Sequence, residues 1–232
     1  MQVLKTGPIL FRFKGFLGVP VEVGTSLGLL VLLFAALGAT AGRGILWPGI
    51  SVALLVIAIY LHELGHAWAS MAQGVPVRRI VLHGSGGFCQ PERVATNAEQ
   101  EFIVAMGPLT NLALWALSSL AAYAMWSLIV DGAGFAIYLA ILFSLFARIN
   151  LALFVFNLIP AHPLDGGRLV HLWLLRKMPP ARALKVSGTI GLVAAIAWFP
   201  MLVWMYLTTG WLLLFAPSIT LHYRMMKGGA RG

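Results

Sequence analysis

The residues best suited to chemistry are two histidines and a glutamate in the segment His62-Glu63-Leu64-Gly65-His66. Residues four apart in an α-helix lie on one face, one turn apart, so both imidazoles can bind one metal ion. Neutral imidazoles suit zinc, whose catalytic sites use three protein ligands and keep one position open. Glu63 is suited to be the general base for an attacking water rather than a ligand. The spacing predicts a hydrolytic zinc site with His62 and His66 as ligands and Glu63 as catalytic base.

This pattern also occurs by chance in soluble helices, but its surroundings here argue against chance. It stands in the second half of an apolar run of about residues 49–71. Three ionisable groups on one turn of an apolar membrane helix are costly unless they bind something. A single metal ion is the partner that satisfies all three.

A third ligand is expected in a proline-interrupted segment that runs from Asn157 to Arg168. Pro160 and Pro163 prevent regular helix there. Non-helical backbone at membrane depth is tolerated only where it is buried in protein or lines a wet cavity. Asp165 offers a compact anionic ligand and is the preferred candidate, and His162 is the alternative.

Composition places these residues in a membrane protein. Of the 232 residues, 60% are hydrophobic and 10% are charged, whereas soluble domains are about 25% charged. Cys89 is the only cysteine, so no intrachain disulfide can form. The first twenty residues show no pattern of a cleaved signal peptide.

A membrane span needs roughly 20 apolar residues, and runs of this kind predict an all-α polytopic protein with about six transmembrane helices. The predicted spans are about 23–40, 49–71, 102–128, 135–158, 187–207 and 210–224. We expect one transmembrane domain over residues 1–232, with a catalytic core of about 49–175.

The net charge of +9 is explained by membrane topology, because Lys and Arg accumulate on the cytoplasmic side. One predicted side carries Lys5, Arg12, Lys14, Arg78, Arg79, Arg93, Arg168, Arg176, Lys177, Arg182, Lys185, Arg224, Lys227 and Arg231, and the other carries Arg43. Both termini and access to the site are therefore expected to be cytoplasmic. The basic residues fit anionic lipid headgroups, and no nucleic-acid partner is expected.

The motifs together resemble the site-2 protease family of intramembrane zinc metalloproteases, in its compact prokaryotic branch without PDZ or CBS domains. The helix motif is His62 to His66, and Asn157 to Gly167 matches the family's N-x-x-P-x-x-x-L-D-G pattern, with Asp165 in the place of the third zinc ligand. Residues 107–111 and Gly86-Gly87 also match. Gly24 stands where the family frequently has a histidine, which affects no proposed ligand. The resemblance implies one zinc ion per chain and a prokaryotic cytoplasmic membrane.

Residues 77–91 read as a hairpin, and the resemblance implies a small membrane-associated β-element there. A membrane helix must unwind before its peptide bonds can be attacked. We expect the hairpin edge at Gly86 and Gly87 to pair with an unwound substrate, and Asn157 to hold a substrate amide or carbonyl. The alternative for the glycines is an ordinary tight turn.

The predicted function is an intramembrane zinc endopeptidase. Its substrates would be single-span membrane proteins, in regulated intramembrane proteolysis or in clearance of signal-peptide remnants. A transporter or channel with a structural metal site is one alternative, although no inverted repeat is evident. A catalytically silent scaffold that binds membrane helices is another.

Overall fold

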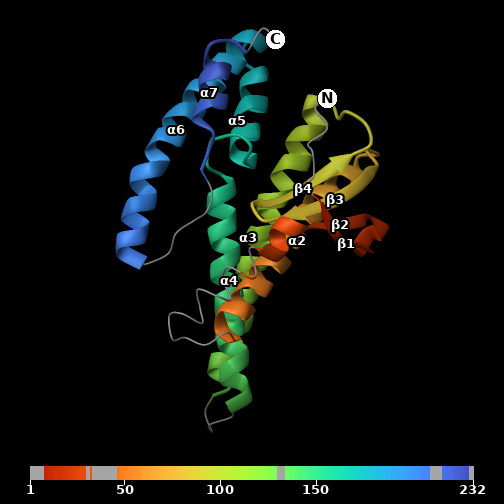
Figure 1. Cartoon of the computed structure of the whole chain (residues 1–232). Helices are drawn as coiled ribbons and strands as arrows, with labels where there is room; N and C mark the ends of the chain where they lie inside the picture. The colour runs from red at the N-terminus through yellow and green to blue at the C-terminus, as the bar shows by residue number, and fades with distance from the viewer. Residues whose placement is uncertain (1–7, 30–31, 33–45, 130–133, 210–215, 230–232) are drawn as a thin grey trace. The chain divides into compact units, whose positions relative to one another are not determined.

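The computed structural model describes residues 8–29, 32, 46–129, 134–209 and 216–229. They form long helices and one small sheet (Figure 1). The helices are α2 (Leu46–Ala72), α3 (Asn97–Ser127), α4 (Gly134–Asn157), α5 (Asp165–Leu175), α6 (Pro180–Thr209) and α7 (Ile219–Met226). The strands are β1 (Ile9–Lys14), β2 (Pro20–Gly24), β3 (Val77–His83) and β4 (Gly86–Pro91), with a 3₁₀ turn, η1, at Phe16–Gly18.

Within this described part, four helices are long and apolar enough to span a membrane: α2, α3, α4 and the Pro180–Trp204 part of α6. They correspond to the predicted second to fifth spans. Most of the predicted first span, 23–40, lies outside the described residues, although residues 25–29 are helical.

The predicted sixth span, 210–224, is not confirmed. Residues 210–215 lie outside the described part, and residues 216–218 are not helical. The eight residues of α7 measure roughly 12 Å, far less than the ~30 Å of a bilayer core. Polar and charged residues recur from residue 218 onward, at Ser218, Thr220, His222, Arg224 and Lys227, so the uninterrupted apolar run ends before residue 224.

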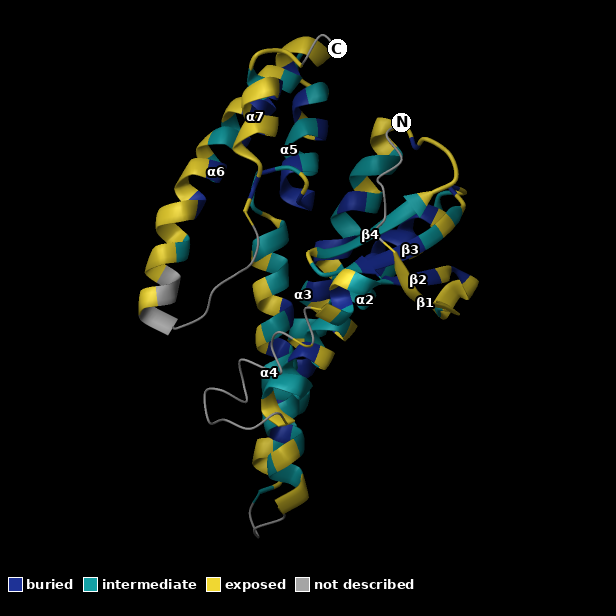
Figure 2. Cartoon of the chain, in the orientation of Figure 1, coloured by how far each residue is buried: buried dark blue, intermediate teal, exposed yellow. Residues whose placement is uncertain are grey.

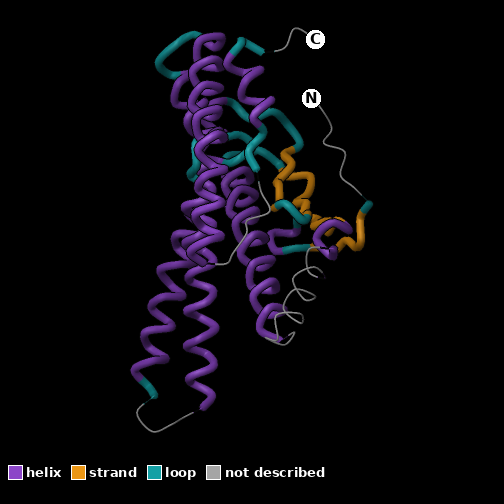
Figure 3. Tube along the Cα trace, turned by 60° about the vertical axis from the view of Figure 1, so that its left-hand side comes forward, coloured by secondary structure: helices purple, strands orange, loops and turns teal. Residues whose placement is uncertain are grey.

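The hairpin at 77–91 is confirmed, but it belongs to a larger sheet than the sequence predicted. The strand order is β1-β2-β3-β4, with β2 parallel to β3 and the other pairs antiparallel. Buried Glu22 on β2 binds Arg12 on β1 at 2.5 Å and Arg79 on β3 at 2.6 Å. Glu22 and Arg79 are 57 positions apart in the sequence, so a local reading of residues 77–91 did not find the pairing of β2 with β3. Figure 3 shows the strands, in orange, gathered together in one region.

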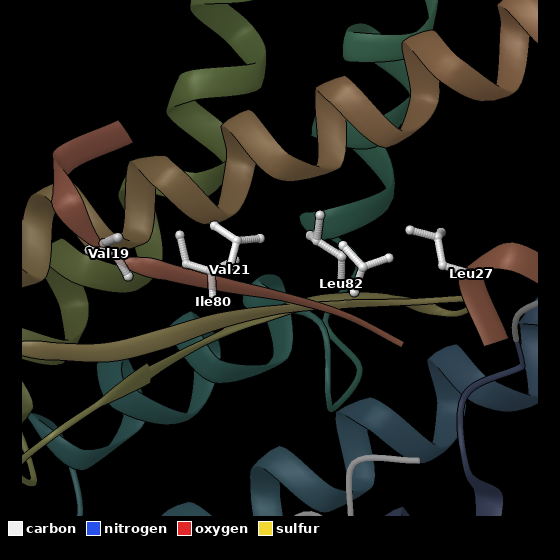
Figure 4. Close-up of a cluster of buried hydrophobic side chains, with 7 residues drawn as sticks. Val19, Val21, Leu27, Ile80 and Leu82 are labelled. Atoms are coloured by element: carbon white, nitrogen blue, oxygen red, sulfur yellow. The ribbon is translucent and has the colours of Figure 1, made fainter. Parts of the chain in front are cut away.

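One face of this sheet packs against α2. Val19, Val21, Val23, Leu27, Ile80 and Leu82 are buried with Ala67 of α2 in one hydrophobic cluster, part of which Figure 4 labels. Val56, Ile59, Tyr60 and Leu64 of α2 pack against the cluster. Burial of apolar surface of this kind contributes ~25 cal/mol per Å². It fixes the sheet against the half of α2 that carries the predicted site.

The chain divides into two compact units, which the long helices α3 and α4 connect. The first contains residues 1–95 and 106–154, and the second contains residues 96–105 and 155–232. The sheet and α2 belong to the first unit, and α5, α6 and α7 to the second. Much of the surface of α6 is exposed (Figure 2), as expected of a helix that contacts lipid.

Candidate metal centre

The second half of α2 presents His62, Glu63 and His66 together. One ligand atom from each lies within 4.8 Å of the others. The Nε2 atoms of the two histidines are 3.1 Å apart. Each of the three residues is only 5% exposed. The helix therefore gathers a nitrogen and oxygen donor set in a buried position, as the spacing predicted.

A chain of hydrogen bonds from a backbone carbonyl determines which nitrogen of His62 is protonated. Asn150 Nδ2 donates to the carbonyl of Phe146 at 2.9 Å, which leaves Asn150 Oδ1 to accept from Asn111 Nδ2 at 2.9 Å. Asn111 Oδ1 is then an acceptor for His62 Nδ1 at 2.6 Å. Because this amide oxygen cannot donate, Nδ1 carries the proton and Nε2 keeps its lone pair.

This arrangement fits a zinc ion. The lone pair of His62 Nε2 lies toward His66 Nε2, so two basic nitrogens converge beside a carboxylate. A hydrogen bond that fixes the remaining ring N–H is the usual support for a metal-binding imidazole. His62 and His66 are the residues of this cluster that would hold the ion.

Glycines on α3 allow that helix to approach the imidazoles. A Cβ at Gly107 would lie 2.3 Å from His66 Nε2 and 2.8 Å from His62 Cε1. On α2, a Cβ at Gly65 would lie 2.2 Å from Thr110 Oγ1. Gly65 therefore has the close-packing role expected of small residues between membrane helices.

The hairpin reaches the same cluster through Gly87. A Cβ at Gly87 would lie 2.7 Å from Glu63 Cγ and 3.0 Å from Glu63 Oε1. Gly86 differs, since its φ of +135° requires glycine while the space around it is open. Gly86 thus begins β4 in a backbone conformation that favours glycine, whereas Gly87 brings the backbone of β4 against the predicted base.

Asp165 is the first residue of α5 and is 5% exposed. The two glycines after it let the preceding segment fold back closely. A Cβ at Gly166 would lie 2.3 Å from the Leu158 carbonyl oxygen, and one at Gly167 would lie 2.5 Å from Ala161 C. Arg168 forms an ion pair with Asp165 at 3.8 Å. Asp165 belongs to the second unit, and its sharing of a metal with the histidines of α2 stays a prediction.

His162, the alternative third ligand, also lies in the second unit, near His171 and His222. Burial, and then the charges of His171, His222 and Arg168, lower its pKa from 6.5 to about 4. The residue is therefore neutral at physiological pH.

Asn157, the predicted substrate contact, is the last residue of α4 and is partly buried.

Three residues that contribute to these sites were not among the predicted site residues. Asn150 orients the side-chain amide of Asn111. In the sequence, Asn150 is marked only as a polar residue within an apolar run. Gly107 makes room for the imidazoles, whereas the sequence suggested helix packing first and substrate contact second. His222 accepts a hydrogen bond from the His162 backbone N–H at 2.9 Å. These partners are 60 positions apart, so the local sequence does not reveal their pairing.

Comparison with known sequences identifies a family. The profile of Peptidase family M50 matches residues 50–141 and 128–198. The zinc metalloprotease MJ0392 of Methanocaldococcus jannaschii is 28% identical over 180 residues, which are 78% of this chain and 50% of that protein. The stage IV sporulation protein FB of Bacillus subtilis is 29% identical over 135 residues, 57% of this chain and 43% of that protein. The chain thus spans about half the length of these relatives.

Comparison with solved structures supports the fold. The site-2 protease from Methanocaldococcus jannaschii superposes with a TM-score of 0.61 and 22% identity. The match covers 94% of this chain and 92% of that one. The helices and the small sheet therefore share the architecture of that protein.

Proposed function

This chain belongs to peptidase family M50, and we propose that it is an intramembrane zinc endopeptidase. The proposed reaction is hydrolysis of peptide bonds within or near the transmembrane segments of membrane proteins. Single-span proteins are the proposed substrates, in regulated intramembrane proteolysis or in clearance of signal-peptide remnants.

One observation carries the proposal most directly: His62, Glu63 and His66 are buried together on a helix apolar enough to span a membrane. A structural metal site in a transporter would need ligands, but it would not need a carboxylate beside the ligands as base. The names of the relatives add support, since MJ0392 is named a zinc metalloprotease.

Each residue has a proposed part in the mechanism. His62, His66 and Asp165 would hold zinc, which when bound polarises the scissile carbonyl and increases the acidity of water. Glu63 accepts the proton of the attacking water and then donates it to the leaving amine. Asn111 keeps His62 in the tautomer whose Nε2 can bind metal. The buried surroundings exclude bulk water and so strengthen these electrostatic interactions.

The substrate is proposed to bind as an added strand. In the described sheet β4 is an edge strand next to β3, and the proposed peptide adds at its outer edge. The contact between Gly87 and Glu63 supports this edge as the binding position, because it brings β4 beside the proposed base. Gly86 shapes the turn that precedes this edge, and Asn157 is proposed to hold a substrate amide or carbonyl.

Cys89, on β4 and the only cysteine of the chain, provides a direct test of strand addition. Substrates with single cysteines at successive positions would be oxidised with the Glu63→Gln enzyme. A strand paired with β4 places alternate residues on the face of Cys89, so cross-linking should recur at every second position. A Cys89→Ser, Phe88→Cys enzyme should give the opposite phase. Cross-linking without this alternation, or none in either enzyme, would contradict strand addition.

The decisive experiment for the function is cleavage of a panel of single-span substrates, with zinc content measured in parallel. We expect Glu63→Gln to retain zinc and lose cleavage, and His62→Ala, His66→Ala and Asp165→Ala to lose zinc. A chelator should abolish wild-type cleavage, and added zinc should restore it. Glu92→Gln, an exposed glutamate beyond β4, is the matched control and should cleave normally. Normal cleavage by Glu63→Gln would overturn the proposal.

We also propose an integral location in a prokaryotic cytoplasmic membrane, with both termini and access to the site cytoplasmic. Arg12 and Lys14 on β1 share a sheet with Arg78 and Arg79 on β3, which supports the proposal that these basic residues lie on one side of the membrane. Lys and Arg accumulate on the cytoplasmic side. Labelling of tags at each terminus in intact and permeabilised cells tests this orientation.

A further inference from the structure

The segment between α4 and α5 has an unusual set of backbone donors. Pro160 and Pro163 have no N–H, and four of the other N–H groups bond nearby. These are Leu158 to Val155, Ile159 to Phe156, Ala161 to Ile159 and Leu164 to Ala161. The remaining donor is the N–H of His162, and it bonds to His222 Nε2 on α7, at 2.9 Å. His222 therefore provides the acceptor that the segment does not supply itself.

His222 is held in the form that can accept. Its side chain is fully buried, with 0% exposed. Its Nδ1 lies 2.7 Å from the carbonyl oxygen of Ser218, which can only accept, so Nδ1 carries the proton. Nε2 is then the acceptor for His162. Both ring nitrogens are used, and the neutral imidazole is fixed in one orientation.

Helix α6 has a space shaped for this ring. A Cβ at Gly191 would lie 2.1 Å from His222 Cδ2 and 2.5 Å from its Nε2. One turn earlier, a Cβ at Gly188 would lie 2.4 Å from the backbone nitrogen of Met226. These two glycines let α7 pack directly against α6, and Figure 1 shows the two helices side by side.

The hydrogen bond between His162 and His222 lies close to Asp165 in the structure. The His162 N–H lies against the first turn of α5, where a Cβ at Gly167 would come within 2.6 Å of it. Asp165 is in that same turn, so fixing His162 restrains the start of α5. Backbone packed this closely moves as a unit rather than bending locally.

We propose that His222 is a positioning residue for Asp165, and that α7 is therefore part of the metal site. This inference rests on the proposed function, in which Asp165 binds zinc. Supporting hydrogen bonds commonly change metal affinity about 10- to 100-fold when they are removed. Here the support is the acceptor nitrogen of His222, acting through the backbone of His162.

The test compares His222→Leu, which removes the acceptor, with His222→Gln, whose amide oxygen can replace Nε2. Two quantities are measured in detergent-solubilised full-length protein. One is hydrogen exchange of a peptide covering residues 158–165 without metal, and the other is zinc affinity by chelator competition. His222→Leu should increase exchange and weaken zinc binding about tenfold or more, and His222→Gln should restore both substantially. Tyr223→Leu, an exposed neighbour on α7, is the matched control and should resemble wild type.

Gly191→Ala provides a second route if His222→Leu fails to fold, because it displaces the ring without removing its nitrogen. It should also increase exchange of residues 158–165. Wild-type exchange and zinc affinity in His222→Leu, or failure of His222→Gln to improve on it, would overturn the inference. If the wild-type protein binds no zinc, the proposed function fails, while the exchange measurements still test the contact itself.

Discussion

His62 Nδ1 and Asn111 Oδ1 lie 2.6 Å apart, and this contact joins the proposed metal ligand on α2 to a buried amide on α3. Asn111 is itself oriented by Asn150, whose side chain bonds to the Phe146 carbonyl. Three helices are thereby connected to one imidazole. The tautomer of His62 is thus determined by a backbone carbonyl on α4.

Asn111→Ala should weaken zinc binding, because it removes the acceptor that keeps the proton on His62 Nδ1. We expect a loss of about 10- to 100-fold in affinity, measured by chelator competition. Asn150→Ala should have a smaller effect in the same direction, since it leaves Asn111 in place but frees its amide to rotate. Ser119→Ala, on α3 like Asn111, is the control. Wild-type affinity in both asparagine variants would show that the tautomer is fixed by other means.

Gly107→Ala should remove zinc binding almost completely. The added methyl carbon would lie 2.3 Å from His66 Nε2, so either the imidazoles or α3 must move. The matched control is Gly49→Ala on α2, where a Cβ has nothing within 4 Å. Metal content by elemental analysis distinguishes the two variants. Equal zinc content in Gly107→Ala and Gly49→Ala would contradict the close contact.

The sequence predicted the parts of this protein that depend on local spacing. His62, Glu63 and His66 converge because a helix repeats every 3.6 residues, and apolar runs located α2, α3, α4 and α6. The hairpin at 77–91 followed from its glycine turn and alternating residues. These features need only neighbouring residues to form.

The features that were missed depend on contacts between distant segments. The sheet includes β1 and β2 because β2 pairs with β3, and the Glu22–Arg79 ion pair that accompanies this pairing joins residues 57 positions apart. The contact of Gly107 with the imidazoles likewise requires α3 to lie against α2. The predicted sixth span is not confirmed for a different reason, since residues 216–218 are not helical and α7 is short.

Glu22→Gln should destabilise the sheet. The carboxylate is 3% exposed and binds Arg79, which is 19% exposed, whereas Arg12 is 61% exposed and contributes little. Loss of the charge leaves Arg79 poorly paired, at a cost on the order of 2 kcal/mol. Hydrogen exchange of residues 77–91 should increase. Glu92→Gln is the control, and exchange unchanged from wild type would show that the ion pairs are dispensable.

His162 should make the second unit less stable in acid. Burial and the neighbouring charges lower its pKa to about 4 in the folded protein, against 6.5 ordinarily. Between these values the unfolded chain binds a proton that the folded chain does not. Its contribution is therefore fully present above pH ~6.5 and is lost as the pH falls toward ~4.

Thermal unfolding of metal-free protein at pH 7.5 and pH 5 measures this loss without titration of bound ligands. The wild-type midpoint should fall on acidification, and the fall should be smaller in His162→Gln, which keeps the backbone N–H that donates to His222. An equal fall in both proteins would mean that the acid sensitivity comes from other groups. Because the substitution leaves that hydrogen bond in place, a difference between the proteins reports the His162 imidazole itself.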